Sequence, residues 1–230
     1  MIIFYLSFLR YNIIIMTFIY YFFQRIAFFP LMEFVKLRTR LKIVGQENCE
    51  NLHGPIIITS NHKDYIDAIV LVAALPFKTK LLPIRSLIWH KIYYLPILHF
   101  LFKITGGIPI AKSKDGNLEE VLSAPLRVLK EKGVVVIFPE GGMIKKQEFG
   151  EGKRGISYLA LKANAPILPI SIKGTLGASF KNLFLGRNNV IIVIGKPFYL
   201  PRSLRCDNKD DLAKGSNLVM KKIKELYDRS

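Results

Sequence analysis

The sequence is poor in cysteine and histidine, with two Cys and four His among its 230 residues. Cys49 and Cys206 form no metal-ligand spacing and are too few for a disulfide framework, so we expect two free thiols in a reducing compartment. So few thiols and imidazoles leave little material for a Cys/His zinc site, and we expect no metal centre. Acidic residues are also scarce, because 17 Asp and Glu stand against 34 Lys and Arg, for a formal net charge of +17.

Internal repeats, low-complexity tracts and convincing linkers are absent as well, and the length fits one domain or one domain with an appended segment. A hydrophobic content of 50% excludes a disordered chain. Only one stretch is apolar enough to cross a bilayer, which excludes a multi-span membrane protein. The positive charge indicates a polyanionic partner, either nucleic acid, an anionic membrane surface or a phosphorylated substrate. No helix-turn-helix, zinc or RNP-type motif is present, so we expect no nucleic acid, and the apolar excess favours a membrane.

The apolar stretch is the start of the chain, residues 1–23. Arg10 falls near its middle, so the segment either tilts across the bilayer or lies in the interface with its aromatic residues at headgroup level. The cations from Arg25 to Lys42 favour a cytoplasmic location for the chain that follows. We therefore predict a membrane-anchoring helical segment over residues 1–38, with the main domain over residues 39–230. An ordinary buried helix is the alternative.

Strand and helix patterns alternate through the rest of the chain. Apolar, β-branched runs predict strands at 42–45, 55–60, 80–84, 107–111, 134–138, 167–172 and 190–194. Helical patterns occupy 65–71 with Asp64 as the N-cap, 86–103 as two short helices, 117–132, 153–163 and 207–228. This alternation predicts an α/β fold with a partly parallel central sheet flanked by helices.

His62 and Asp67 follow one of these strands at a spacing of five residues. On a single helix that spacing would separate the two side chains by about 140°. They can pair only if His62 lies in the turn before the helix and Asp67 in its first turn. Asp67 would then fix the histidine tautomer and leave the other ring nitrogen as a base, which suits deprotonation of a hydroxyl. Alternatively, Asp64 and Asp67 both complement the helix N-terminus and His62 is a turn residue.

Two glycine-containing motifs follow other predicted strands or lead into them. Phe138-Pro139-Glu140-Gly141-Gly142 comes directly after the strand at 134–138, and its glycines allow backbone amides to turn toward an anion. Glu140 is either a functional carboxylate or a partner of Lys145 or Lys146. Gly106 to Lys112 is a glycine turn into a short strand that ends in a cation.

Together these motifs resemble the glycerolipid acyltransferase family that contains 1-acylglycerol-3-phosphate acyltransferase (lysophosphatidic acid acyltransferase). Asn61-His62 with Asp67 resembles the family's N-H-x-x-x-x-D block, and Gly106 to Lys112 its G-x-x-P-[IV]-x-R block. Phe138 to Gly141 is similar to its F-P-E-G block, and Ala165 to Ile170 to its x-P-[IV]-x-P-[IV] block. The resemblance covers the chain roughly from Val44 to Pro197.

The resemblance implies transfer of a fatty acyl group from an acyl thioester, of coenzyme A or acyl carrier protein, to the free hydroxyl of 1-acylglycerol-3-phosphate. The product would be phosphatidic acid, and the partners would be membrane lipids, the lysophospholipid acceptor and the acyl donor, without a cofactor. Glycerol-3-phosphate or another lysophospholipid is the alternative acceptor. A catalytically inactive lipid-binding protein of the same fold is a further alternative, which an intact His62–Asp67 pair disfavours.

Carried over by position, His62 would be the general base and Asp67 its orienting partner. Lys112 would hold the phosphate, and Glu140 and Gly141 would shape its pocket. The predicted substrate-binding set is completed by Asn61, Arg85, Lys145, Lys153 and Arg154.

The chain departs from the family pattern at three places. Lys63-Asp64 stands where a polar pair such as Gln-Ser is usual, so Asp64 can compete with Asp67 for His62. Lys112 stands where Arg is usual, which keeps the charge and loses the bidentate fork. The usual Thr-Arg-Ser after Phe-Pro-Glu-Gly is replaced by Gly142-Met143-Ile144, so another cation has to stand in for its arginine. The candidates are Lys145, Lys146, Lys153 and Arg154.

Overall fold

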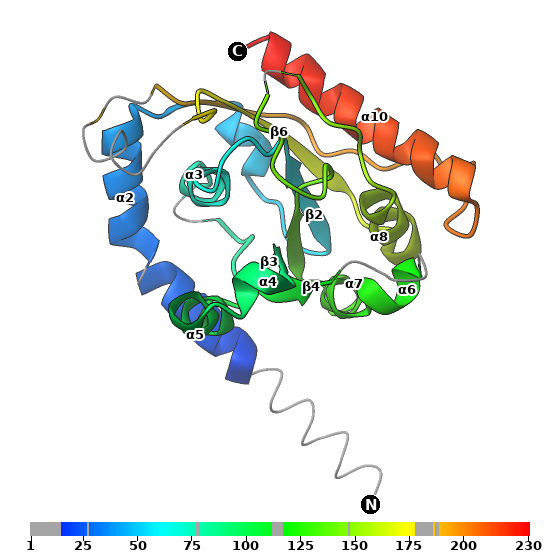
Figure 1. Cartoon of the computed structure of the whole chain (residues 1–230), viewed down its shortest axis with the longest axis horizontal. Coiled ribbons are helices and arrows are strands. Elements are labelled where there is room, and N and C mark those ends of the chain that lie inside the picture. Colours follow the sequence, from blue (N-terminus) through cyan, green and yellow to red (C-terminus); the bar gives the residue numbers. More distant parts are fainter. Residues whose placement is uncertain are drawn as a thin grey trace, which may run out of the picture.

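The computed structural model describes residues 15–26, 28–76, 79–111, 117–146, 148–177, 186 and 189–230. Its centre is a seven-stranded sheet in the order β1-β7-β6-β2-β5-β3-β4 (Figure 1). The strands are β1 (Lys42–Val44), β2 (Ile56–Ser60), β3 (Ile84–Trp89), β4 (Ile108–Ile110), β5 (Val134–Ile137), β6 (Ile167–Lys173) and β7 (Ile191–Ile194).

Five neighbouring strands of this sheet, β6, β2, β5, β3 and β4, run parallel to one another. Strand β7 is antiparallel to β6, and β1 pairs with β7 in parallel. The predicted α/β fold with a partly parallel sheet is therefore confirmed. Parallel strands end at the same edge of a sheet, so the segments that follow β2 and β5 leave the sheet side by side.

Helices cover both faces of the sheet (Figure 1). They are α2 (Phe28–Thr39), η1 (Gln46–Cys49), α3 (Asp67–Ala73), α4 (His90–Tyr93), α5 (Pro96–Ile104), α6 (Leu118–Val121), α7 (Ser123–Lys130), α8 (Gly155–Ala163) and α10 (Lys209–Asp228). Along β2, Ile56 and Ile58 face the core beneath α2 and α3, whereas Ile57 faces the core beneath α7, α8 and α10. This alternation explains why the strand is apolar along its length, because both of its faces are buried.

Three predicted elements differ from the structure. Helix α3 begins at Asp67 rather than after Asp64, and no side chain caps its first turn. The strand predicted at 80–84 is shifted along the chain and forms β3 at 84–89. Residues 86–89, which were predicted to be helical, belong to this strand because it pairs with β5 and β4. The helix expected over 117–132 is divided at Leu122 into α6 and α7.

The chain before the sheet is helical over residues 15–26 and again in α2. Gln24 fastens the first of these helices to the sheet, since its amide exchanges hydrogen bonds with the N–H and C=O of Ile84 and also donates to the Thr105 carbonyl. Figure 1 shows this helix beside α5. Among the described residues, no helix is both long and apolar enough to cross a membrane. Residues 1–14, most of the predicted apolar stretch, lie outside the described part.

Candidate active site

His62 and Phe138 meet where β2 and β5 end. The register of these strands places Thr59 opposite Ile137, and both chains then leave the same edge of the sheet. The His62 ring stacks on the Phe138 ring with 4.1 Å between centroids and an interplanar angle of 16°. Two of the sequence motifs are thus joined in space by one aromatic contact, which fixes one face of the imidazole.

His62 and Asp67 form the hydrogen-bonded pair that their spacing allows. His62 lies in the histidine turn (residues 61–66), Asp67 is the first residue of α3, and His62 Nδ1 is 2.9 Å from Asp67 Oδ2. The same oxygen accepts the backbone N–H of Lys63 at 2.5 Å and of Asp64 at 2.8 Å. Asp67 is fully buried. Asp64 therefore does not compete for the imidazole, because its backbone helps to hold the carboxylate that binds it.

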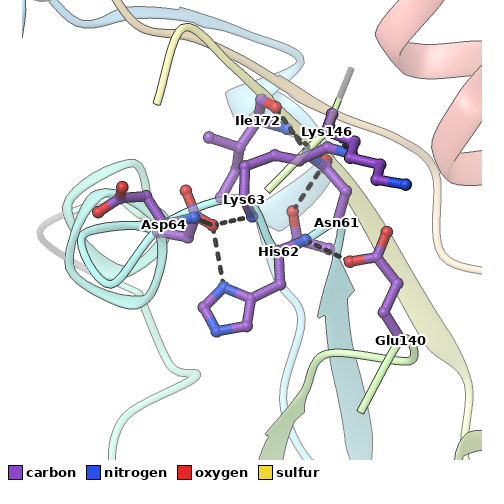
Figure 2. Close-up of polar contacts among 9 residues, drawn as sticks. Asn61, His62, Lys63, Asp64, Glu140, Lys146 and Ile172 are labelled. Atoms are coloured by element: carbon purple, nitrogen blue, oxygen red, sulfur yellow. Dashed lines mark hydrogen bonds and ion pairs between the residues drawn. The ribbon is translucent and has the colours of Figure 1, made fainter. Parts of the chain in front are cut away.

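The second ring nitrogen of His62 faces open space. Asp67 Oδ2 acts as an acceptor for two backbone N–H groups and, in the same way, for His62, so Nδ1 is the donor in this pair and Nε2 has the lone pair. The side chain is 17% exposed. In the part of the chain that the structure describes, no group hydrogen-bonds to Nε2, and Figure 2 shows the ring pointing away from the strands. Such a nitrogen can take a proton from an incoming hydroxyl.

Glu140 ties the turn after β5 to the histidine turn. Its Oε2 accepts the His62 backbone N–H at 2.8 Å, and its Oε1 accepts the Gly150 N–H at 3.1 Å. Burial raises the pKa of Glu140, and these two hydrogen bonds oppose the rise. The sequence left Glu140 as either a functional carboxylate or an ion-pair partner of Lys145 or Lys146. Among the described contacts, Glu140 forms no ion pair with either lysine. The carboxylate instead braces the backbone beneath the imidazole.

Asn61 and Gly141 shape the site in different ways. The Asn61 amide is buried and pairs with the backbone of Ile172, as donor to its C=O at 2.8 Å and acceptor from its N–H at 2.9 Å. Gly141 has a φ of 69°, which L side chains rarely adopt, and a Cβ there would lie 3.1 Å from Lys153 Cγ. Asn61 thus joins β2 to β6, while Gly141 allows the Lys153 side chain to lie against the Phe-Pro-Glu-Gly turn.

The predicted cations do not all lie together. Lys145, Lys146 and Lys153 are exposed near the histidine turn, and Arg154 is half-buried just before α8. Arg85 lies on β3, where its Nε donates to the Gly106 carbonyl at 2.5 Å and its guanidinium lies 4.4 Å from the Tyr20 ring centroid. Lys112 falls outside the described residues.

Sequence reasoning missed the role of Lys63. Its side chain is almost completely buried and donates to the carbonyl groups of Lys146 and Glu148. The only signal was its place in the motif, where the family usually has a neutral residue. The described residues include no group of three His, Cys, Asp or Glu side chains that could hold a metal ion.

Comparisons with known proteins identify the family of the chain. A profile of the acyltransferase family matches residues 40–173. A chloroplast 1-acyl-sn-glycerol-3-phosphate acyltransferase of Brassica napus is 26% identical over 77% of this chain and 51% of its own length. The Bacillus subtilis protein of the same name is 28% identical over 86% of this chain and 94% of its own.

A solved structure shows the same fold. The crystal structure of the 1-acyl-sn-glycerophosphate (LPA) acyltransferase PlsC from Thermotoga maritima superposes with a TM-score of 0.60 at 16% identity, covering 95% of this chain and 97% of that one. The chain spans about half the length of the plant relatives it matches.

Proposed function

The chain belongs to the acyltransferase family, and on that premise we propose that it transfers a fatty acyl group from an acyl thioester to the free hydroxyl of 1-acylglycerol-3-phosphate. The product is phosphatidic acid. The relatives support this acceptor by their names. The observation that carries the proposal is the hydrogen bond of 2.9 Å between His62 and Asp67, with Nε2 left open at the end of the parallel strands.

His62 acts as the general base. Its Nε2 takes the proton of the acceptor hydroxyl while the hydroxyl oxygen attacks the thioester carbonyl, and Asp67 stabilises the imidazolium that forms. The new ester C–O bond forms, the C–S bond breaks, and the leaving thiolate takes the proton back from His62. No covalent acyl-enzyme is needed, because the two substrates react directly. General-base assistance of this kind contributes about 10²–10⁴-fold to the rate.

The acceptor phosphate is bound by the cations around the histidine turn. Lys145, Lys146 and Lys153 are exposed on the loop that Glu140 braces, and Arg154 follows them. Lys112 is proposed to complete this set. The turn at Gly141 has a left-handed conformation of the kind found in backbone anion-binding sites, although the Gly141 N–H itself donates to the Phe138 carbonyl at 3.1 Å.

A panel of acceptors tests this proposal. Purified protein is given palmitoyl-CoA or palmitoyl acyl carrier protein with lysophosphatidate, glycerol-3-phosphate or lysophosphatidylcholine, and the products are identified by mass spectrometry. We expect phosphatidic acid from lysophosphatidate, and the smallest yield from the choline lipid, whose phosphate is shielded by a cation. Faster acylation of glycerol-3-phosphate would assign the alternative acceptor, and no product from any acceptor would contradict the proposed activity.

We further propose that residues 1–38 dock the acyltransferase domain, residues 39–230, on the cytoplasmic face of a membrane. Large apolar side chains are exposed on the helix of residues 15–26 and on the neighbouring α4–α5 segment, among them Phe18, Phe22, Ile97 and Phe100. Ile97 is 87% exposed and Phe100 67% exposed. An exposed apolar surface beside a basic chain fits an anionic bilayer.

Charged substitutions on α5 test the docking. Replacing Ile97 and Phe100 by Glu should lower co-flotation with phosphatidylglycerol vesicles about 100-fold, because each apolar side chain contributes about 1.5–3 kcal/mol. The control is Tyr199→Glu, since Tyr199 is 61% exposed and lies after β7, away from this helix pair. If the double variant floats as well as the control, α5 does not contact the membrane.

A further inference from the structure

Lys63 joins the histidine turn to a loop far along the chain, the site loop (residues 141–146 and 148–150). Its ammonium donates to the Lys146 carbonyl at 2.9 Å and to the Glu148 carbonyl, and it lies 5.0 Å from the centroid of the Phe149 ring. Its side chain is 3% exposed. The three N–H groups of an ammonium can thus be satisfied by two carbonyl groups and one aromatic face.

The Lys63 ammonium is buried, yet it is held by backbone carbonyl groups and not by a carboxylate. Among the described residues, no carboxylate lies within ion-pair distance of Nζ, although Glu140 and Asp67 are near enough to raise its pKa. Burial acts against them and lowers the pKa of Lys63. A buried ammonium that is held mainly by backbone carbonyls fixes the path of that backbone, because it holds main-chain atoms rather than mobile side-chain ends.

The site loop has few other anchors. It forms neither helix nor strand, and two further backbone groups anchor it: Ile144 N–H donates to the His62 carbonyl at 2.8 Å, and Gly150 N–H donates to Glu140 in the turn after β5. On its outer side, Phe149 packs edge-on against Tyr227 of α10 with 5.0 Å between centroids. Lys63 is therefore the one long side chain among these anchors that reaches the segment carrying Lys145 and Lys146.

We propose that Lys63 is a positioning residue, which clamps the site loop to the histidine turn and so holds the Lys145 and Lys146 side chains at the entrance for the acceptor phosphate. Lys63 holds Lys146 through its backbone carbonyl, and Lys146 is exposed. This arrangement supplies a fixed pair of cations where the chain lacks the arginine after Phe-Pro-Glu-Gly. The part of this inference that concerns the acceptor phosphate rests on the proposed function. The part that concerns the contact of Lys63 with the site loop rests on geometry alone.

Native-state proteolysis tests the clamp without any substrate. Trypsin needs the backbone after Lys145 or Lys146 to enter its active-site cleft, so a faster appearance of fragments ending there reports a site loop that opens more often. Lys63→Met keeps the length of the side chain and removes its donors, and we expect cleavage about 10–100-fold faster. Lys63→Arg, which can still donate to both carbonyls, should restore slow cleavage. Lys222→Met is the matched control, because Lys222 lies 5.2 Å from the Phe198 ring centroid, away from the site loop.

A second variant covers the case in which Lys63→Met fails to fold. Phe149→Leu keeps apolar bulk on the loop and removes the aromatic face beneath the ammonium. We expect it to accelerate the same cleavage by about 2–30-fold, the range of a cation–π contact. Urea unfolding of each variant measures its global stability. If that stability is unchanged, faster cleavage is due to opening of the site loop and not to unfolding of the whole chain.

Kinetics test the positioning. In Lys63→Met we expect the KM for lysophosphatidate to rise about 10-fold while kcat stays within about threefold, because the clamp affects acceptor binding and leaves the His62–Asp67 pair in place. Wild-type cleavage rates in Lys63→Met would overturn the clamp. Faster cleavage with an unchanged KM would overturn the positioning role. A chain that acylates no acceptor would refute the proposed function and leave the proteolysis result standing, so the two failures are distinguishable.

Discussion

Replacement of Asp67 by Asn separates the charge of this side chain from its shape. The amide oxygen can occupy the place of Oδ2 and still accept from His62, Lys63 and Asp64, so the histidine turn keeps its fold. The amide nitrogen then takes the place of Oδ1, which is buried and has no hydrogen-bond partner among the described residues. Two unpaired N–H groups there cost about 1–3 kcal/mol of stability, which is a fraction of the roughly 5–15 kcal/mol typical of a folded domain.

The effect on catalysis is larger than the effect on stability. The lost carboxylate no longer stabilises the His62 imidazolium of the transition state, and unit charges about 4 Å apart at an effective dielectric constant of about 20 interact by about 4 kcal/mol. With partial compensation by solvent at the open side of the ring, we expect a loss of about 2–4 kcal/mol, or roughly 30- to 1000-fold in kcat.

The assay measures thiol release from palmitoyl-CoA at saturating lysophosphatidate, together with urea unfolding to confirm the fold. Asp64→Asn is the matched control, since only the backbone of Asp64 contacts Asp67, and it should retain activity within about threefold. If Asp67→Asn keeps activity near that of the control, the carboxylate does not serve His62 and the reasoning from the pair is refuted.

Two further predictions concern buried groups. Glu140→Gln should destabilise the chain by about 1–3 kcal/mol in urea unfolding, because the amide can accept only one of the N–H groups of His62 and Gly150 and turns a donor toward the other; unchanged stability would mean that one of these bonds is not formed. Burial raises the pKa of the Cys49 thiol to about 11 from an ordinary 9.0, so at pH 8 its thiolate fraction, and with it the rate of alkylation in the native chain, should be about 100-fold below that of an ordinary thiol. Cys206 is half-buried and should react first, and equal labelling of both cysteines before unfolding would contradict the burial of Cys49.

The central geometry of the site could be predicted from sequence because it depends on local order. A strand, a turn and a helix follow one another within a few residues around His62 and Asp67, and a spacing of five then permits only one way for the side chains to meet. The sequence also placed His62 and the Phe138 motif directly after strands, and in the structure these strands are parallel neighbours, so both motifs lie at one edge of the sheet. These inferences needed the type of each element and not its exact boundary.

Element boundaries were harder to predict for a physical reason. Residues 86–89 form an apolar and aromatic run, which is compatible with a helix or a strand when taken alone. The pairing of residues 84–86 with Val134–Val136 and of residues 87–89 with Ile108–Ile110 makes the segment a strand, and these partners are distant in the sequence. Asp64 has the side chain of an N-cap, but the oxygen that gathers the local N–H groups belongs to Asp67.

The interactions of Lys63, Glu140 and Arg85 could not be predicted from their neighbours. Lys63 reaches carbonyl groups more than 80 residues away, and Glu140 accepts from His62 at a separation of 78 residues. Arg85 was expected to bind substrate; the structure shows it bonded to Gly106 and lying on Tyr20, so its substrate role stays a prediction. Charged residues at such positions are visible in a sequence, whereas their partners are set by packing.

The most direct test of the central claim is the rate of phosphatidic acid formation by His62→Ala, compared with the unaltered chain under saturating lysophosphatidate and palmitoyl-CoA. The substitution leaves Asp67 bound to the Lys63 and Asp64 N–H groups, so the fold and vesicle binding should persist. We predict a loss of at least about 100-fold, the lower limit of the contribution of a general base. Phosphatidic acid formation at the rate of the unaltered chain would contradict the assignment of His62 as the base.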